Sequence, residues 1–566
     1  MRKHKWLAFL LVMAMVLSLA LTGCGKKEEP APVDTEGEGE EEPLEEGEKL
    51  AEEQILRINW GEEPPDLDPQ TTTDQVSIEV INACYEGLVR LNPDGTVGEG
   101  LAESWEDKEN EDGTVTYTFH LRDANWSDGT PITAQDFEFS WFRAIDPEVA
   151  AQYSYQLTDT AGIKGAAAYF EGETTDKSQV GIKAVDDKTF EVTLERDIPF
   201  FLSLCSFPTF IAAQQAAVEE FGEEFASAPD KMVYSGPFVI SEWQHDQKLN
   251  LKKNENYWDA ENVKLEEIQG DMIVEANTSI NLYESDELDV TGVPAEFIDT
   301  YKDSDEFLSF AEATTWYVQY NCEDKYTSNQ NLRFALSSAI DRQSFVDNVL
   351  ANGSLVAGGL TPPLLPGKDG KEFAENRGDV LPAYDTDAAK EYFDKALEEL
   401  GATKEEVEKH LSFLTDESDN AKKYAAAIQA MWKQTLGIEV PIEYASFAIR
   451  LDRYNRKDYT TTFAGWGGDY NDPLTFMDLF VTGGGNNDAF WSNETYDAAI
   501  KEALEGDEVS RIDAMITAEK ALAEELPVMP VYVQARNVLQ KSNVKDVARF
   551  PVGADLDFKW AYLIEK

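Results

Sequence analysis

The sequence predicts a fold of the mixed α/β class (α+β in places), and three observations support this. Helix and strand patterns alternate along much of the chain, as in "AKKYAAAIQAMWKQTLG" at 421–437 followed by "IEVPIEYAS" at 438–446. Elsewhere, runs that alternate apolar and polar residues are separated by tight-turn sequences, which indicates antiparallel hairpins. No repeat of solenoid period is visible. Together these patterns exclude an all-α and an all-β chain.

The first part of the chain combines helix patterns with hairpins. Residues 74–91 show helical spacing with Gly87 near the end. Asp-Gly-Thr occurs three times between alternating runs, which predicts hairpin turns at Asp94–Thr96, Asp112–Thr114 and Asp128–Thr130. A calcium loop is the alternative, but its alternating ligands and distal glutamate are missing. Thr133 is expected to cap the next helix, with Asp136 at the third helical position as in a variant capping box.

Several other stretches have a clear period. Strand patterns occupy 56–60, 180–196, 235–258 and 526–540, and helix patterns occupy 331–350, 387–400 and 421–437. The uncharged stretch 198–218 is long enough to span a membrane, but Pro199 and Pro208 interrupt it and polar residues dilute it. We therefore expect it to be a buried segment that crosses between lobes.

Length and charge limit the kinds of function. With 566 residues, 42% of them hydrophobic and 11% aromatic, the chain is globular and long enough for two or three lobes. Its formal net charge of −61 repels phosphate backbones, so no nucleic-acid partner is expected. Cationic or zwitterionic small ligands are tolerated or mildly attracted. The simplest explanation of the charge itself is solubility.

The N-terminus carries a targeting signal. "MRKHK" is a basic n-region, and the apolar run 6–22 leads into "LTGC" at 21–24. This arrangement resembles the lipobox of bacterial lipoproteins, which implies a signal peptide at 1–23 and acylation of Cys24, for example with palmitate. An uncleaved membrane anchor is the alternative. Acyl chains on Cys24 would hold the protein at the extracytoplasmic face of the plasma membrane.

Residues 24–53 differ in composition from the rest of the chain. They are dominated by Glu with Gly and Pro, which predicts a solvated, disordered tether; an acidic metal-binding tail is the alternative. Without Cys24 the cysteines are Cys84, Cys205 and Cys322, an odd number without close spacing. No disulfide framework and no zinc site are expected, and each thiol is predicted to be a small buried hydrophobe.

Signatures of catalysis are missing from the sequence. Three histidines follow the signal region, each isolated: His120, His245 and His410. HExxH, GxSxG, Walker A and a GxGxxG following a strand are all absent. A glycosidase pair of carboxylates is compatible with the composition, but no particular pair stands out. We expect no enzyme, no cofactor and no metal site.

A series of sequence blocks identifies a family resemblance. The blocks, in order, are "NWGEEPPDLDPQ", "YEGLVRLNPDG", "LAESWE", "YTFHLRDANWSDGTPITAQDF", "SGPFVI", "NENYW", "LRFALSSAIDR" and "GGLTPP". The chain resembles the peptide/nickel/dipeptide class of extracellular solute-binding proteins, and within it the oligopeptide-binding branch that serves ABC importers.

The resemblance implies a two-lobe, periplasmic-binding-protein-like fold with an extra domain and a hinge between the lobes. The first domain would be discontinuous, and the implied segments are 54–85 with 209–315 and 534–566 for domain I, 86–208 for domain II and 316–533 for domain III.

The stretch "GWGGDYNDP" at 465–473 has two interpretations. By composition it is a polar turn entering a helix, with Asp472 or Asn471 near the cap and Pro473 in the first turn. The resemblance adds that Trp466, Asp469, Tyr470, Asn471 and Pro473 match a Trp-x-x-Asp-Tyr-Asn-x-Pro segment that binds ligand. It implies that Asp469 pairs with the α-amino group of a peptide. Gly467 and Gly468 would allow main-chain bonds to the peptide.

Other implied ligand contacts match less completely. The resemblance places Tyr532 in a ligand-contacting position, with a core strand tyrosine as the alternative, and Tyr155 in another. Phe463 replaces an arginine that can meet a peptide's C-terminal carboxylate, and Thr73 replaces an acidic residue, with Asp74 beside it. Two further arginines, Arg453 and Arg456, lie near this region but out of register. Ligand length and C-terminal anchoring therefore stay open.

The expected function is an extracytoplasmic receptor. It would capture oligopeptides between two closing lobes and deliver them to the permease of an ABC transporter, acting as a monomer. One alternative is the same fold specialised for another solute, such as a dipeptide, a metal chelate or a sugar. The other is a surface signalling or adhesion lipoprotein.

Overall fold

The computed structural model describes residues 48–506 and 508–566. The predicted signal peptide, Cys24 and most of the predicted tether lie outside the described residues. The chain divides into a unit of residues 1–48 and a unit of residues 49–566, and everything below concerns the second unit. Within it the last residues of the predicted tether contact the C-terminal segment, since the Ala51 amide donates to the Leu563 carbonyl at 2.9 Å.

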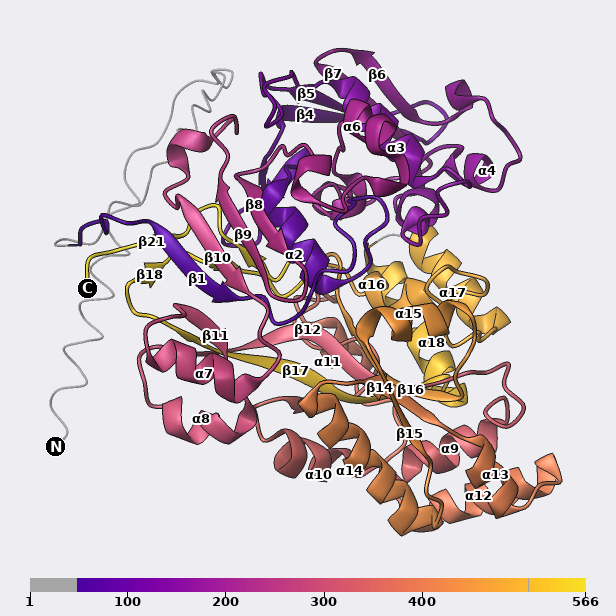
Figure 1. Ribbon diagram of the computed structural model, residues 1–566. Coiled ribbons are helices and arrows are strands. Elements are labelled where there is room, and N and C mark those ends of the chain that lie inside the picture. Colours follow the sequence, from indigo (N-terminus) through magenta and orange to yellow (C-terminus); the bar gives the residue numbers. More distant parts are fainter. Residues whose placement is uncertain (1–47, 507) are drawn as a thin grey trace, which may run out of the picture. The chain divides into compact units, whose positions relative to one another are not determined.

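The largest sheet has eleven strands and follows the order β15-β14-β16-β12-β17-β11-β1-β10-β9-β8, with β13 paired to β17 beside this path (Figure 1). Its strands are β1 (Ile55–Asn59), β8 (Phe238–Gln244), β9 (Lys248–Lys253), β10 (Glu267–Asp271), β11 (Val290–Gly292), β12 (Phe307–Tyr320), β13 (Leu355–Val356), β14 (Phe413–Asp416), β15 (Ile442–Ala445), β16 (Thr461–Gly467) and β17 (Val528–Gln540). The predicted strands at 56–60, 235–258 and 526–540 all belong to this sheet.

The long antiparallel pair β12 and β17 joins the two halves of the sheet. Its register shifts between Ala311 and Thr315 and again between Trp316 and Tyr317. A register shift of this kind bends and twists a strand. The predicted domain boundaries at 315/316 and 533/534 fall inside these two strands, and the division into three domains stays a prediction.

A second sheet has the order β4-β5-β7-β6. Its strands are β4 (Ala102–Glu109), β5 (Val115–Leu121), β6 (Ile182–Asp186) and β7 (Thr189–Leu194). Three two-stranded sheets complete the β-structure of the described residues: β2 (Val89–Leu91) with β3 (Val97–Glu99), β18 (Val544–Lys545) with β21 (Tyr562–Leu563), and β19 (Ala548–Arg549) with β20 (Leu556–Asp557).

The three Asp-Gly-Thr turns form as predicted. In each, the aspartate Oδ1 accepts hydrogen bonds from the backbone amide and the hydroxyl of the threonine two residues on. The central glycines have φ of +80° at Gly95 and +85° at Gly113 and Gly129, a region that other residues rarely adopt. The turn is therefore built by its own three residues.

The helices cover the faces of the sheets. Their bounds are α2 (Gln75–Cys84), α3 (Ala134–Ala144), α4 (Ala166–Phe170), α5 (Phe201–Leu204), α6 (Gln215–Phe221), α7 (Ala276–Glu284), α8 (Ala295–Tyr301), α9 (Gln330–Ser338), α10 (Arg342–Ser344), α11 (Phe373–Arg377), α12 (Thr386–Leu400), α13 (Lys404–His410), α14 (Asp419–Leu436), α15 (Phe447–Asn455), α16 (Leu474–Met477), α17 (Glu494–Glu505) and α18 (Glu508–Glu525). Helix α3 carries the predicted capping box of Thr133 and Asp136 and lies beside the four-stranded sheet (Figure 1). Helix α14 ends at Gly437, as predicted.

Short helices occupy several connections. Two are π-helical, η1 (Gln156–Thr160) and η7 (Phe345–Leu350). The others are 3₁₀ turns at η2 (Lys177–Gln179), η3 (Pro208–Phe210), η4 (Gly222–Glu224), η5 (Pro229–Lys231), η6 (Ala260–Asn262) and η8 (Asp478–Phe480).

Two predicted helices are wrong in extent. The helix predicted over 74–91 ends at Cys84, and Val89–Leu91 is strand β2. A side chain at Gly87 would lie 2.9 Å from the Cys205 carbonyl, so the chain after Cys84 packs its backbone against a distant segment instead of continuing the helix. The helix predicted over 331–350 breaks after α9, because the Asp341 side chain accepts from the Ser344 amide and caps a new helix there.

The stretch 198–218 is largely buried, as predicted. Its side chains Phe201, Leu204, Cys205 and Phe210 have no exposed surface and belong to the main hydrophobic core. Among the residues described, no helix is long and apolar enough to cross a membrane. Cys84, Cys205 and Cys322 are free thiols, and the first two are buried.

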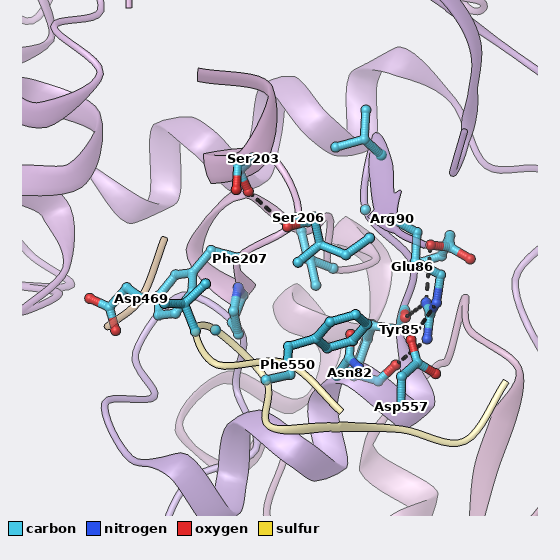
Figure 2. Close-up of a pocket in the computed structure, with 18 residues that line it drawn as sticks. Asn82, Tyr85, Glu86, Arg90, Ser203, Ser206, Phe207, Asp469, Phe550 and Asp557 are labelled. Carbon is cyan, nitrogen blue, oxygen red and sulfur yellow. Dashed lines mark hydrogen bonds and ion pairs between the residues drawn. The ribbon is translucent and has the colours of Figure 1, made fainter. Parts of the chain in front are cut away.

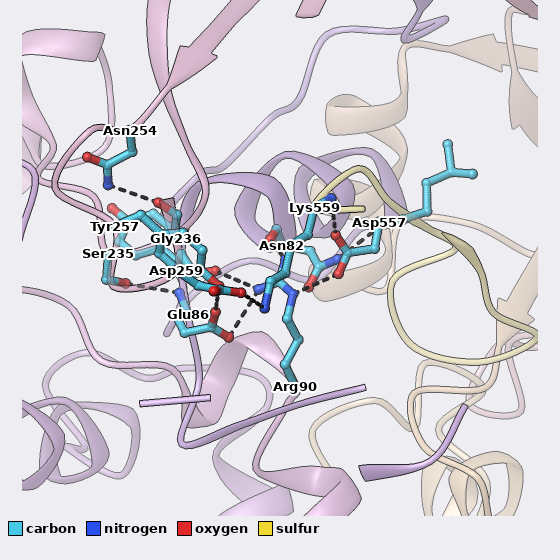
Figure 3. A network of polar contacts seen from close by, with 12 residues as sticks. Asn82, Glu86, Arg90, Ser235, Gly236, Asn254, Tyr257, Asp259, Asp557 and Lys559 are labelled. Atoms are coloured by element: carbon cyan, nitrogen blue, oxygen red, sulfur yellow. Dashed lines mark hydrogen bonds and ion pairs between the residues drawn. The ribbon is translucent and has the colours of Figure 1, made fainter. Parts of the chain in front are cut away.

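A buried polar network ties together three distant parts of the chain (Figure 3). The Arg90 guanidinium pairs with Glu86 at 3.1 Å and with Asp557 at 2.8 Å. The Tyr257 hydroxyl donates to the Glu86 carboxylate, and Lys559 pairs at 2.8 Å with Asp259, two residues after Tyr257. The C-terminal segment is thereby attached to the end of α2.

Candidate functional site

Two adjoining chambers lie beside the pair β12 and β17. The first has a volume of about 290 Å³ and the second of about 500 Å³. Both are lined by Trp316, Arg450, Gln534 and Arg536, so the two chambers adjoin at these four side chains. Within the described residues, no group of three or more His, Cys, Asp or Glu side chains is arranged to hold a metal ion.

Asp469 lines the first chamber from the loop that follows β16. Strand β16 pairs with β12, Trp466 opposite Thr315, and this pairing places the loop at the cavity wall. The Asp469 carboxylate accepts hydrogen bonds from the Tyr153 hydroxyl at 3.3 Å and from the side-chain amide of Gln156 at 3.2 Å. It forms no ion pair with any described residue.

Asp472, and not Asp469, lies beside the start of helix α16, one residue before its N-cap Pro473. The Asp472 carboxylate accepts from the Leu474 amide at 3.0 Å, at the start of α16. It also forms a two-pronged ion pair with Arg511, the shorter contact being 2.6 Å. Asp472 is thus fully partnered by the protein, whereas both donors to Asp469 are neutral.

The electrostatics of Asp469 favour a cation beside it. Burial raises the pKa of Asp469 well above its ordinary value, and the negative charge of Asp478 raises it further. The hydrogen bonds from Tyr153 and Gln156 act in the opposite direction but do not cancel the effect. A buried carboxylate without a positive partner is costly, and an ammonium group in the chamber would remove that cost.

The glycines near Asp469 permit close packing at the wall. Trp466 and Gly467 both line the first chamber. A side chain at Gly465 would lie 2.8 Å from the ring of Trp316, and one at Gly467 would lie 3.2 Å from the Thr314 hydroxyl. Gly465 is therefore needed for β16 to pack against Trp316, a role that the sequence did not indicate.

The three predicted tyrosines lie in different places. Tyr532 lines the second chamber, where its ring stacks on Trp316 at 6.1 Å, although only 4% of it is exposed. Tyr470 lines neither chamber: its hydroxyl donates to Asp478 at 2.7 Å and its ring stacks on Phe200. Tyr155 also lines neither chamber. A ligand role for each stays a prediction.

Three more residues line the first chamber: Tyr153, which the sequence analysis did not name, and Thr73 and Asp74, which it named as a departure from the family pattern. The Tyr153 ring lies 5.9 Å from that of Tyr155. The Asp74 side chain also caps α2 through the Ser77 amide. Burial raises the pKa of Asp74 to about 6.

Arg450 brings a positive charge to the wall near Phe463. It is buried in α15, and its Nη1 donates to the Phe463 carbonyl at 2.9 Å. Arg453 and Arg456, which the sequence placed near this region, pair with carboxylates elsewhere and line neither chamber. Arg450 lies four residues before Tyr454 on α15, and both side chains are buried. This helical spacing is the sequence signal that could have identified Arg450.

A small third cavity of about 30 Å³ lies near the end of α2 (Figure 2). In Figure 2, Asp469 and Phe207 line one side of it, and Tyr85 and Arg90 line the other. Its volume suits a water molecule or two and no larger ligand. Asp469 therefore borders both this cavity and the large first chamber.

Comparison with known proteins shows the family. The model of the family "Bacterial extracellular solute-binding proteins, family 5 Middle" matches residues 96–488, which is more than half of the chain, so the chain belongs to that family. Its relatives include the oligopeptide-binding protein OppA of Bacillus subtilis, 36% identical over 91% of this chain and 94% of that protein. The dipeptide-binding protein DppE of the same organism is 33% identical over 91% and 92%.

Solved structures confirm the mixed α/β fold of periplasmic binding proteins. Peptide-bound OppA of Listeria monocytogenes has 34% sequence identity and superposes with a TM-score of 0.84, covering 91% of this chain and 99% of that one. An unliganded open form of the murein tripeptide-binding protein MppA, 28% identical, gives only 0.61, with coverage of 92% and 99%. The arrangement of this chain is thus nearer to the peptide-bound relative than to the open one.

Proposed function

We propose that the protein is an extracytoplasmic receptor that binds oligopeptides and delivers them to an ABC importer. The observation that carries this proposal is Asp469, a cavity-lining carboxylate whose protein partners are both neutral. A peptide's α-ammonium supplies the missing charge, and the adjoining chambers leave room for the residues that follow it. Relatives that bind oligopeptides and dipeptides support the same ligand class. The protein itself performs no catalysis.

Closure of the cavity involves the segment that contains η1. Tyr153 and Gln156 contact Asp469, and the Thr160 hydroxyl donates to Asp478 at 3.2 Å. Tyr153 to Thr160 belong to the proposed domain II, and the two aspartates belong to domain III. We infer that these contacts form when the lobes close over a ligand, and that closure strengthens the ammonium–carboxylate pair by removing water. The lower TM-score against the open relative supports this inference.

The proposal includes a lipid anchor. Acylated Cys24 would hold the receptor, as a monomer, at the outer face of the plasma membrane. Replacing Cys24 with Ala is expected to prevent acylation and leave unprocessed precursor, as detected by mass spectrometry of the membrane fraction. Normal processing and acylation of the Cys24→Ala protein would contradict the anchor without affecting the peptide-binding proposal.

The experiment that tests peptide binding is native mass spectrometry of the purified protein. We expect co-purified peptides, released on denaturation and identified by their fragmentation. Calorimetry with a series of synthetic peptides from two to six residues then separates a dipeptide receptor from an oligopeptide receptor. A protein that releases no peptide and binds none of the series would rule the proposal out. Loss of peptide uptake on deletion of the gene would distinguish import from signalling.

A further inference from the structure

A second carboxylate, Asp488, lines the first chamber at a position that the proposed amine site does not use. The loop that carries it is held in place from both sides. The Tyr459 hydroxyl donates to the Asp488 carbonyl, and the Cys322 amide donates to the carbonyl of the next residue, Ala489, at 2.9 Å. The preceding residue, Asn487, bonds through its side chain to the Trp491 carbonyl at 2.8 Å. The Asp488 side chain is therefore presented on a fixed backbone.

The Asp488 carboxylate differs from the other acidic side chains of this chamber in having no partner. Among the described residues it forms neither a hydrogen bond nor an ion pair. The other acidic side chains are engaged: Asp74 caps α2, Glu312 and Asp555 pair with Arg536, and Asp469 accepts from Tyr153 and Gln156. Burial raises the pKa of Asp488 to about 7.

The surroundings of Asp488 suit a long cationic side chain. Tyr317, Leu451 and Tyr454 line the same chamber. Burial raises the pKa of both tyrosine hydroxyls, and the charge of Asp488 raises it further. Aromatic and aliphatic surfaces accommodate the methylene stem of lysine or arginine, and ring faces also attract the charged head. The Arg450 guanidinium lies 5.7 Å from the centre of the Tyr454 ring, and its own bonds go to the Phe463 carbonyl at 2.9 Å and to the Asp416 carboxylate at 3.9 Å.

We propose that Asp488 is a second cation-binding position of the cavity, and that it selects peptides carrying a lysine or arginine side chain in addition to the α-ammonium. This inference rests on the proposed function. The charge of the wall supports it, since the first chamber is lined by five carboxylates, at Asp74, Glu312, Asp469, Asp488 and Asp555, and by two guanidinium groups, at Arg450 and Arg536. A ligand with two positive charges offsets more of that excess than a neutral peptide does.

Calorimetry on paired tripeptides tests the inference. Each pair carries lysine or its uncharged isostere norleucine at the first, second or third position of an alanine tripeptide. We expect the wild type to prefer lysine at one position by about 10- to 100-fold, the range of a charge-assisted hydrogen bond. Asp488→Asn should abolish that preference yet keep the loss of affinity on N-acetylation. Asp394→Asn, an exposed change on α12, is the control for net charge and should leave the preference unchanged.

Two further results complete the test. Asp488→Lys is expected to invert the preference, so that glutamate at the same position binds better than lysine. Equal binding of lysine and norleucine peptides by the wild type, or a lysine preference that survives Asp488→Asn, would overturn the inference. In either case N-acetylation would still weaken binding if the proposed function is correct. Absence of binding to every tripeptide and longer peptide would overturn both.

Discussion

At the scale of single residues, the carboxylate of Asp469 decides whether the cavity recognises a free amino terminus. Asp469→Asn keeps the shape of the side chain and removes its charge. Leaving a buried cation without its partner costs about 3–5 kcal/mol, or roughly 10²- to 10³-fold or more in affinity. N-acetylation of the peptide should cost the wild type a similar amount, because it removes the same pair from the other side.

A thermodynamic cycle on these changes is the decisive measurement. N-acetylation should cost the Asn variant much less than the wild type, since both changes address one interaction and do not add. Phe463→Ala should alter the preference among peptide lengths and keep the dependence on the amine. Calorimetry on the four combinations of protein and ligand provides the comparison. Equal losses on acetylation in both proteins would place the amine site elsewhere in the cavity.

The pKa of Asp478 predicts a dependence of stability on pH. Burial raises the pKa of Asp478 from 3.8 to about 7. Between these values the folded state keeps a proton that the unfolded state has released, so the free energy of unfolding falls as pH rises through this window. Asp478→Asn should make the decrease smaller without abolishing it, because Asp488 and Glu312 also have pKa values raised to about 7.

Denaturant unfolding of the ligand-free protein at a series of pH values measures this slope. Asp394→Asn, which is exposed on α12, should leave the slope as it is in the wild type. An unchanged slope in Asp478→Asn would show that Asp478 is ionised throughout the range.

At the scale of elements, the π-helical turn η1 aligns two side chains with two different aspartates. Gln156 donates to Asp469 and Thr160 donates to Asp478 from the same turn. Such turns are rare and occur often at functional sites. We expect Gln156→Leu to weaken binding of a free-amine peptide by about 10-fold, since a hydrogen bond to a charged group is lost.

Thr160→Val is the matched control for Gln156→Leu. It removes a hydrogen bond of similar length from the same turn but leaves Asp469 untouched, so the difference between free and N-acetylated peptides should stay as in the wild type. If both variants change that difference equally, the effect comes from disturbance of η1 as a whole.

At the scale of the whole unit 49–566, the network around Arg90 holds segments that are remote in sequence. Arg90→Met removes the guanidinium and leaves Glu86 and Asp557 buried without their cation. We expect a loss of about 3–5 kcal/mol in the free energy of unfolding, measured by denaturant titration. Lys302→Met breaks the exposed pair with Asp299 and should leave the free energy of unfolding nearly unchanged, because solvent screens the pair. Similar losses in both variants would show that the network contributes little.

Features formed by neighbouring residues could be predicted from the sequence. The Asp-Gly-Thr turns and the Thr133 capping box each complete their hydrogen bonds within a few residues, so the local sequence determines them. The mixed α/β class follows from periodicity for the same reason. The helix over 74–91 was wrong because Gly87 packs against the Cys205 carbonyl, a contact that no local pattern contains.

The site divides in the same way. The sequence was enough to make Asp469 a candidate, because its neighbours match a family segment. It was also enough to predict a solute-binding protein, because the family's sequence blocks occur in order. The surroundings of Asp469 and Asp488, in contrast, depend on contacts between distant parts of the folded chain. The donors to Asp469 lie 316 and 313 residues away in the chain, and Asp488 has no distinguishing neighbours in sequence. The burial of the two carboxylates and the absence of a partner for Asp488 are properties of their folded surroundings. These surroundings depend on the pairing of β12 with β16 and β17, which the sequence alone does not reveal.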